Sequence, residues 1–215
     1  MHPINAFLDQ QLGVRRQQKQ PGQPLIIGIG GGTGSGKSTI AAEIQRRLAP
    51  LAVTIVNQDK FFKPREEMPT YFSEFFRKPC PDFNRPDSIY ADRMIAHCQK
   101  LSGMDVAVLE GILMLYYPEM RQLMDVSCYV SLDLDEMLIR RTKRNLAAGY
   151  GGDYEEIAHY NLECVTRQHL RYNAPTERLA QLVIPNGAEE AAQREEILTS
   201  LCSAIQRQFA TAGDK

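Results

Sequence analysis

The chain has 215 residues, which fits one domain with small additions and allows roughly 70% of the unfolded surface to be buried. Hydrophobic residues make up 43% and charged residues 24%, which are ordinary values for a globular protein. The formal net charge of −1 argues against a general nucleic-acid binder, because such a protein needs an excess of basic residues. No apolar run reaches the roughly 18 residues of a membrane span, and the first residues lack the features of a secretory signal.

The cysteines and histidines predict neither a metal site nor a disulfide framework. The five cysteines are odd in number, and no two have CxxC spacing. His159 and His169 fall on different faces of one expected helix, with no further ligand to complete a zinc set. Buried free thiols fit a reducing compartment, so we expect a cytoplasmic protein without membrane or nucleic-acid partners.

The N-terminal segment is predicted to be an amphipathic helix followed by a linker. Its apolar residues recur at helical spacing over residues 3–20, at Ile4, Phe7, Leu8 and Leu12. Pro21, Gly22 and Pro24 end the segment. Basic residues at only one end favour a packing role over a membrane anchor. We therefore expect a helix and linker over residues 1–24 and one domain over residues 25–215.

From residue 25 onward, short apolar runs alternate with stretches of helical periodicity. The expected strands are residues 25–29, 53–56, 106–109, 126–132 and 182–184. The expected helices are a segment striped by Ile40, Ile44 and Leu48, then 88–101, 133–147, 153–172, and a last helix striped by Ile197, Leu201 and Ile205. This alternation predicts an α/β fold with a parallel sheet that helices cover on both faces.

Two further patterns bear on local structure. Asp133 with Glu136, and Asp153 with Glu156, have the spacing of capping boxes that open helices. Residues 60–88 are rich in aromatic residues, proline and charge without a clear period, so we expect a long irregular segment. Its aromatic content favours an ordered segment that faces a ligand.

The glycine-rich loop after the first expected strand carries the strongest functional signal. It matches the P-loop pattern G-x-x-x-x-G-K-[ST] with Gly31, Gly32, Thr33, Gly34, Ser35, Gly36, Lys37 and Ser38. Glycines let successive backbone N–H groups turn inward around an anion, and the following helix adds the positive end of its dipole. We expect Lys37 to reach the β- and γ-phosphates of a nucleotide and the Ser38 hydroxyl to ligate Mg²⁺.

Two carboxylates are expected at the carboxyl ends of strands, where open α/β sheets bind ligands. Asp59 follows the second strand and can either accept the proton of an attacking hydroxyl or cap a turn. Glu110 ends the third strand, where a P-loop protein has its magnesium-side carboxylate; the alternative is a strand end exposed to water. Phe61 and Phe62 can stack on a flat ring or pack internally.

A basic cluster follows the fourth strand. Arg141 and Arg144 are neighbours on one helix face, where they can bind phosphoryl oxygens or form a solvated basic surface. Gly149, Gly151 and Gly152 come next and suit a hinge or lid tip that excludes water.

Together these motifs resemble the uridine kinase and phosphoribulokinase family of P-loop kinases over about residues 25–187. The resemblance is carried by the P-loop, Gln58–Phe62, Arg85–Ser88, Leu109–Leu113, Val130–Asp133, Arg140–Arg141 and Leu182–Gly187. It implies a P-loop NTPase fold, with a parallel sheet of about five strands and a lid. It also implies a uridine-kinase-like phosphotransferase that uses ATP and Mg²⁺ and acts on the 5′-hydroxyl of a nucleoside.

The same resemblance implies a role for each motif residue. Asp59 corresponds to the base, and Lys37, Arg141 and Arg144 to the groups that meet the phosphates. The ATP site is the P-loop with Thr39, and Asn186 falls near the adenine. Ser38 and Glu110 face Mg²⁺. The implied acceptor site comprises Asp59, Phe61, Phe62, Phe83, Asn84 and Arg85.

Departures from the family pattern leave the acceptor open. Asn84 and Arg85 replace an Asp that holds the ribose hydroxyls in uridine kinases and the His after it. The β-hairpin that supplies a Tyr and a His around the pyrimidine is absent, because only residues 99–103 separate the expected helix from the next strand. Further lid arginines of uridine kinases fall on Gly149 and Gly151, whereas the run Asp59–Pro64 is closer to nicotinamide riboside kinases.

Three hypotheses follow for the activity. The first is a nucleoside kinase, the second a kinase for nicotinamide riboside or another small sugar-type acceptor, and the third a regulator that hydrolyses ATP slowly. Asp59 and the aromatic segment 61–83 favour an acceptor pocket over the third. The expected partner is a small nucleoside or riboside, and a homo-oligomer stays open.

The P-loop assignment predicts that Lys37→Ala abolishes phosphoryl transfer and leaves the fold intact. The ammonium would be a partly dehydrated charge on the transferring phosphate, which no alanine replaces. Steady-state turnover should fall to a small fraction of wild type while the circular dichroism spectrum is unchanged. Near-normal turnover would refute the assignment.

Overall fold

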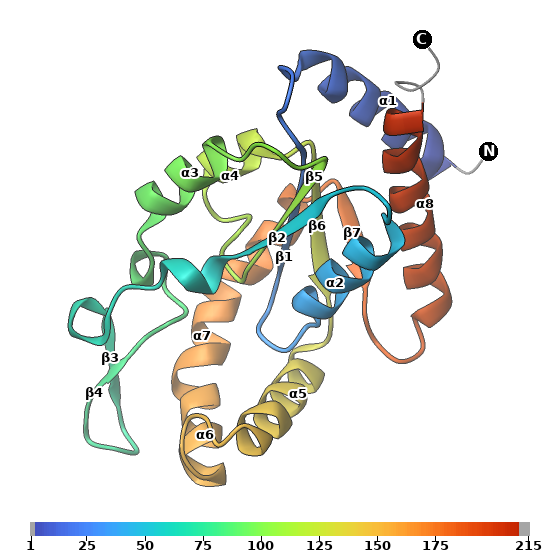
Figure 1. Ribbon diagram of the computed structural model, residues 1–215. Coiled ribbons are helices and arrows are strands. Elements are labelled where there is room, and N and C mark those ends of the chain that lie inside the picture. Colours follow the sequence, from blue (N-terminus) through green and yellow to red (C-terminus); the bar gives the residue numbers. More distant parts are fainter. Residues whose placement is uncertain (1–2, 211–215) are drawn as a thin grey trace.

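The computed structural model describes residues 3–210 and has a five-stranded sheet at its centre (Figure 1). The strands are β1 Leu25–Gly31, β2 Val53–Asn57, β5 Val106–Glu110, β6 Val126–Ser131 and β7 Leu182–Pro185. They lie in the order β2-β5-β1-β6-β7, and every neighbouring pair runs parallel. The expected α/β fold with a parallel sheet is therefore confirmed.

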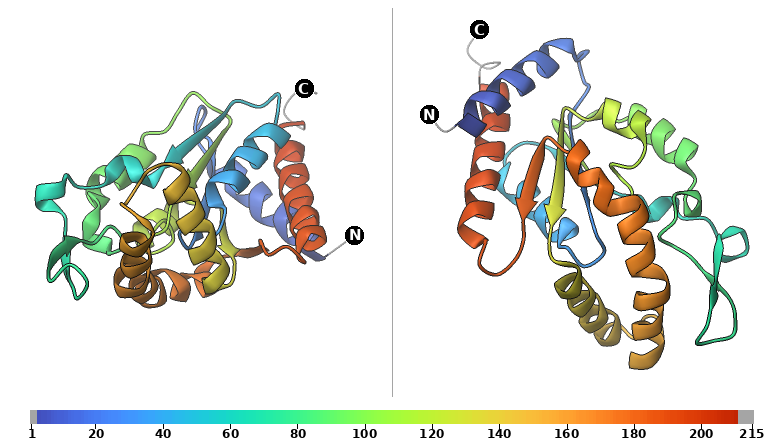
Figure 2. Two further views of the ribbon diagram at one scale, coloured as in Figure 1. Left: turned by 90° about the horizontal axis from the view of Figure 1, so that it is seen from below. Right: turned by 180° about the vertical axis from the view of Figure 1, so that it is seen from behind.

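Helices cover both faces of this sheet, which makes three layers (Figures 1 and 2). One face carries α1 Pro3–Gln18, α2 Lys37–Arg47 and α8 Ala191–Ala210. The other carries α3 Ala91–Gln99, α4 Pro118–Leu123 and part of a helical run over residues 154–179. The helix α5 Leu134–Ala147 follows β6. No helix in the described part of the chain combines the length and apolarity that a membrane crossing requires.

The helical run over residues 154–179 is the least regular element. It consists of α6 Tyr154–Tyr160, a π-turn over Asn161–Val165, α7 Thr166–Gln168, a second π-turn over His169–Asn173 and a 3₁₀ segment over Ala174–Leu179. A helix was expected to end at about residue 172, whereas the run continues to residue 179. Single π-turns inside helices are uncommon and often mark functional sites.

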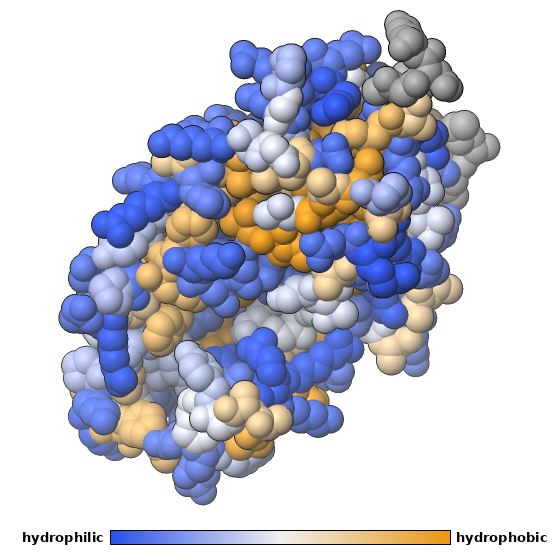
Figure 3. Space-filling view, in the orientation of Figure 1, coloured by the Kyte–Doolittle hydropathy of each residue, from blue (hydrophilic) through white to orange (hydrophobic). Residues whose placement is uncertain are grey.

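Strand β1 separates two apolar cores. Leu25, Ile27 and Ile29 point into the core beneath α1, α2 and α8, whereas Ile26 points to the opposite side. On that opposite side a Cβ at Gly28 would clash with the Met124 side chain, so only glycine permits this close packing. β2 is an edge strand of the sheet. In the orientation of Figure 1, where β2 lies in front, an apolar band crosses the visible face of the molecule (Figure 3). All five cysteines are buried free thiols.

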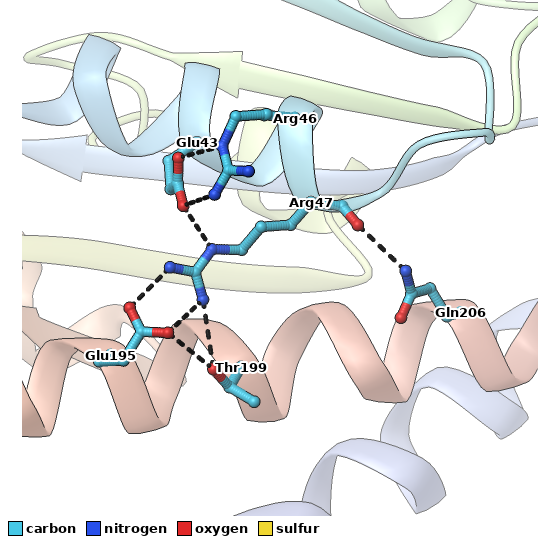
Figure 4. A network of polar contacts seen from close by, with 6 residues as sticks. All are labelled: Glu43, Arg46, Arg47, Glu195, Thr199 and Gln206. Atoms are coloured by element: carbon cyan, nitrogen blue, oxygen red, sulfur yellow. Dashed lines mark hydrogen bonds and ion pairs between the residues drawn. The ribbon is translucent and has the colours of Figure 1, made fainter.

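A charged network joins α2 to α8 at the surface (Figure 4). The Arg47 guanidinium pairs with Glu43 on its own helix and with Glu195 on α8, both at 2.6 Å. Gln206 Nε2 donates to the Arg47 carbonyl at 3.0 Å. Such surface pairs contribute little free energy, so the network aligns two helices that the core beneath them holds together.

Residues 60–88 contain more regular secondary structure than the sequence predicts. They contain a hairpin of two short antiparallel strands, β3 Thr70–Ser73 and β4 Lys78–Pro81. The expectation of a wholly irregular segment was therefore wrong. The strands are four residues each, and β4 holds Pro79 and Pro81, which cannot donate to a ladder. Only an isolated two-stranded sheet accepts such a strand, and no periodicity signals it.

The two predicted capping boxes have different outcomes. At α6, Asp153 Oδ1 accepts from the Glu156 backbone, and Glu156 Oε2 accepts from the Asp153 backbone, both at 2.9 Å. At α5, Asp133 occupies the N-cap, but its side chain makes no capping bond, because the Glu136 backbone N–H donates to Asp135 Oδ1 at 2.9 Å. The Glu136 side chain pairs with Arg140 at 2.8 Å. The capping box predicted for Asp133 and Glu136 was therefore wrong. Helix α4 was not anticipated, since six residues are too few to show a period.

Helix α1 packs on the core rather than standing apart. Leu8 and Leu12 are fully buried together with apolar residues of α8, and Asp9 pairs with Arg207 at 2.8 Å. The division of the chain at residue 24 stays a prediction, but burial of these leucines makes α1 part of the hydrophobic core.

We predict that Leu8→Ala lowers the free energy of unfolding by about 2–5 kcal/mol, because truncation of a fully buried leucine leaves a cavity. Val14→Ala on the same helix is the control, since Val14 is 51% exposed and its loss should change little. Urea unfolding of both variants measures the difference. A Leu8→Ala variant as stable as wild type would show that α1 is a dispensable appendage.

Candidate active site

The carboxyl ends of β1, β5 and β2 bring the predicted motifs to one edge of the sheet. β1 leads into the P-loop, and Glu110 and Asn57 end the two strands beside it. Three P-loop positions require glycine: Gly31, Gly34 and Gly36 have φ of 138°, 82° and 97°. A Cβ at Gly34 would also clash with the Met137 carbonyl. The loop can therefore adopt its turn only with these glycines.

Lys37 begins α2 and folds back over the P-loop. Its Nζ donates to the Gly32 carbonyl at 2.7 Å, and the side chain is buried. Burial lowers the pKa of Lys37 to about 8, although the charges of Glu110 and Asp59 oppose the shift. An ammonium held in so little water interacts strongly with an anion that enters the loop.

Ser38 and Glu110 form an oxygen pair beside the loop. Ser38 Oγ donates to Glu110 Oε1 at 3.0 Å, and Asn57 Nδ2 donates to the same oxygen at 2.7 Å. Burial raises the pKa of Glu110, while Lys37 lowers it. Because Glu110 is buried, the alternative of a strand end exposed to water is wrong. A hydroxyl and a carboxylate at this spacing fit Mg²⁺, which binds oxygen ligands.

Asp59 lies in a 3₁₀ turn, Gln58–Phe61, directly after β2. The turn is capped by Asn57, whose Oδ1 accepts from the Asp59 backbone N–H at 2.6 Å. The Asp59 carboxylate therefore does not cap the turn, and it lines the cavity described below. Partial desolvation raises the pKa of Asp59, whereas Lys37 and Arg144 lower it. This geometry supports the interpretation of Asp59 as a base.

The two arginines of α5 serve different parts of the site. The charge of Arg144 acts on both Lys37 and Asp59, where it opposes protonation of those groups beside the P-loop. The Arg141 guanidinium lies over the Tyr160 ring, 5.4 Å from its centroid. Arg141 Nε is buried and has no hydrogen-bond partner among residues 3–210. Arg141 lines the cavity described below, next to Tyr160.

A cavity of about 760 Å³ extends from the P-loop to the β3–β4 hairpin. Its far part is aromatic: Phe62 and Phe83 meet edge to face at 5.5 Å, and Tyr71 and Tyr160 at 5.9 Å. Asn84 Nδ2 donates to Tyr160 Oη at 3.1 Å. The nitrogen of Asn84 is thereby occupied, which leaves its oxygen to accept from a hydroxyl group.

Asn84 is oriented by a buried carboxylate that the sequence did not single out. Asp82 is fully buried, and its Oδ1 accepts from the Asn84 backbone at 2.9 Å. Gln168 Nε2 donates to Asp82 Oδ2 at 2.6 Å. The Asp that uridine kinases have at position 84 is absent here, and the nearest carboxylate is Asp82, two residues earlier, which does not line the cavity.

Three predicted site residues outside the P-loop, besides Asn186, do not line this cavity. Phe61 packs against His97 with ring centroids 5.5 Å apart, so internal packing is the correct alternative for it. Arg85 pairs with Asp87 at 2.8 Å and does not line the cavity. Thr39 is exposed on α2 and also does not line the cavity. Packing on His97 of α3 orients Phe61, and the ion pair with Asp87 orients Arg85. Thr39 points to solvent because of its position on α2.

Two asparagines hold the P-loop from behind. Asn186 Nδ2 donates to the Ser35 carbonyl at 2.6 Å, so this residue braces the loop. Asn173 Nδ2 donates to the Gly31 carbonyl at 3.0 Å and to the Ile112 carbonyl. Nothing in the sequence marks Asn173, because only the second π-turn directs its side chain to the loop.

Comparisons with known proteins show which family and which fold this chain is similar to. A family model described as "Phosphoribulokinase / Uridine kinase family" matches residues 77–193. A uridine kinase of Clostridium botulinum strain Langeland is 28% identical over 86% of this chain and 99% of its own length. One from strain Kyoto is 30% identical over 77% of this chain and 89% of its own. A gluconokinase structure from Sinorhizobium meliloti aligns with a TM-score of 0.52 at 13% identity, over 87% of this chain and 97% of that chain.

We predict that Asn173→Asp weakens nucleotide binding at least tenfold. The substitution removes both donated hydrogen bonds and places a carboxylate against two buried carbonyls, which frees the P-loop from its support. Titration calorimetry with ATP, at a temperature where the variant is folded, measures the affinity.

Asn161→Asp is the matched control. Asn161 is also a buried asparagine of the helical run, but its Nδ2 donates to Thr142 Oγ1 at 2.9 Å rather than to the P-loop. Both variants should lose stability, and only Asn173→Asp should lose nucleotide affinity. Equal losses of affinity would reduce Asn173 to a general structural role.

Proposed function

The chain belongs to the phosphoribulokinase/uridine kinase family, and on this premise we propose that it transfers the γ-phosphate of ATP to the 5′-hydroxyl of a nucleoside or a related riboside. The observation that carries the proposal is the Asp59 carboxylate, which makes no hydrogen bond or ion pair with its side chain in the described part of the chain. It faces the cavity between the P-loop end, with Lys37, and the aromatic end, with Asn84. A hydrolase or a passive nucleotide binder needs no such carboxylate beside a second compartment.

ATP would occupy the P-loop end. Backbone N–H groups of the loop and the N-terminus of α2 would hold the phosphates, with Lys37 between the β- and γ-phosphates. Ser38 and Glu110 would hold Mg²⁺, which neutralises phosphate charge when bound. Asn186 would support nucleotide binding indirectly, because its hydrogen bond to the Ser35 carbonyl holds the P-loop in position.

The acceptor would enter from the hairpin side. Its sugar hydroxyls would donate to Asn84, and its ring would lie among Phe62, Phe83 and Tyr71. Asp59 would take the proton of the 5′-hydroxyl while the hydroxyl oxygen bonds to the γ-phosphorus. The bond from that phosphorus to the β–γ bridging oxygen breaks, and ADP leaves. Arg144 would stabilise the charge on the phosphoryl oxygens.

Asp59→Asn should reduce turnover by about 10²–10⁴, the usual contribution of a positioned general base, and leave ATP affinity near wild type. Asp87→Asn is the control, because Asp87 is 53% exposed and pairs only with Arg85 in this region. Steady-state rates and calorimetry of both variants test the role. A raised KM for the acceptor at unchanged turnover would make Asp59 a binding residue.

The acceptor compartment predicts weak discrimination between pyrimidines. Stacking surfaces tolerate different rings, whereas rejection of an analogue requires polar groups that read its edge. Initial rates at matched ATP and Mg²⁺ should give uridine and cytidine kcat/KM values within about tenfold, roughly 1.4 kcal/mol. Nicotinamide riboside should also be phosphorylated at a measurable rate.

Two outcomes of this panel would contradict the proposal. A preference above about a thousandfold for one pyrimidine nucleoside, near 4 kcal/mol, would show that other residues read the base. A slow ATP consumption that no riboside stimulates would favour the nucleotide-binding regulator over a kinase.

A further inference from the structure

Two basic side chains line the acceptor end of the cavity without any acidic partner. Arg65 follows the Asp59 turn in a short 3₁₀ segment, Arg65–Glu67, and Lys78 begins β4. Within residues 3–210 neither side chain makes an ion pair or a side-chain hydrogen bond; Lys78 Nζ lies over the Phe76 ring at 5.3 Å. Phe76 also lines the cavity, so this contact keeps the ammonium at the wall.

The carboxylates that line the cavity lie elsewhere. Glu110 accepts from Ser38 beside the P-loop, and Asp59 lies in the turn directly after β2, where its charge still acts on Lys37. The third, Glu156, accepts from the Asp153 backbone in the capping box of α6. The hairpin and the segment before it therefore contribute basic and aromatic side chains to the cavity wall. An acceptor without an anionic group would leave Arg65 and Lys78 without an ionic partner there.

Contacts with the helical run over residues 154–179 hold the β3–β4 hairpin in place, so the position of its basic side chains relative to the cavity is fixed. Glu163 of the helical run accepts from Ser73 Oγ at 2.6 Å and from the Phe75 backbone at 3.0 Å. The Phe75 ring stacks on His159 with centroids 4.0 Å apart. Both further views show the hairpin beside this run and away from α2, the helix that begins with Lys37 (Figure 2).

We propose that the acceptor carries an anionic group, a carboxylate or a phosphate, and that Arg65 and Lys78 bind it at the end of the cavity remote from the reacting hydroxyl. This inference rests on the proposed kinase function and assigns the acceptor's charge. Arginine binds such groups through two parallel N–H···O bonds, and lysine adds a point charge. Charge complementarity of this kind gives specificity more than raw affinity.

The first test compares two ribosides that differ only in charge. Nicotinic acid riboside has a carboxylate where nicotinamide riboside has a carboxamide, so shape and stacking are the same. At matched ATP and Mg²⁺, kcat/KM for the carboxylate should exceed that for the carboxamide at least tenfold. The preference should shrink as salt is raised from 50 mM to about 500 mM, because screening weakens exposed charge pairs.

Variants locate the effect. Arg65→Gln and Lys78→Gln should each raise KM for the anionic acceptor severalfold and change the KM for ATP and the rate with the carboxamide less than twofold. Arg77→Gln is the matched control: it removes a cation from the same hairpin, but Arg77 pairs with Glu74 at 2.7 Å and does not line the cavity. It should leave both acceptors unchanged.

A second set of acceptors tests this inference independently of the riboside proposal. It also distinguishes a carboxylate from a phosphate as the anionic group. Glucose, gluconate and glucose 1-phosphate share one carbon skeleton and a free primary hydroxyl, and they are a neutral, a carboxylate and a phosphate acceptor. If no riboside is phosphorylated but an anionic sugar is, the riboside proposal fails and the charge inference stands. Equal kcat/KM for the members with and without the anionic group in both sets, or no reaction with any acceptor that carries an anionic group, would overturn it.

Discussion

The shape of the P-loop depends on donors for its inward carbonyl groups. Since its N–H groups must face an anion, the carbonyls turn into the protein, where each requires a hydrogen bond. Asn173 and Asn186 supply the bonds for Gly31 and Ser35, and Lys37 bonds the loop from within. These donors come from the second π-turn, the segment after β7 and the start of α2. The conformation of the P-loop therefore depends on residues from distant parts of the domain, although the P-loop motif itself is one short segment of the chain.

Charge divides the cavity into two compartments. The P-loop end collects Lys37, Arg144 and the Glu110 carboxylate, a set suited to a nucleotide with its metal. The hairpin end holds aromatic rings and unpaired cations, a set suited to a flat acceptor with an anionic group. Asp59 lies where the two meet. In the function that we propose, a base at that boundary would meet the acceptor hydroxyl from one side and the phosphate from the other.

The helical run over residues 154–179 connects the two compartments. Tyr160 in its first part contacts Arg141 and Asn84, and Glu163 anchors the hairpin. Asn173 in its last part holds the P-loop. A π-turn adds a residue to one helical turn and so rotates the side chains that follow. Two such turns let one run direct polar groups to the acceptor wall and then to the base of the P-loop.

The sequence by itself determined the parallel sheet, the P-loop and the positions of Asp59 and Glu110, because glycine spacing, apolar periodicity and strand ends are local properties. Only the tertiary structure decided which way side chains point. It turned Phe61 onto α3, left Arg85 paired outside the cavity and brought Asn173 to the P-loop. Packing and hydrogen-bond competition set these directions, and both depend on neighbours that are distant in the chain and leave no periodic trace within it.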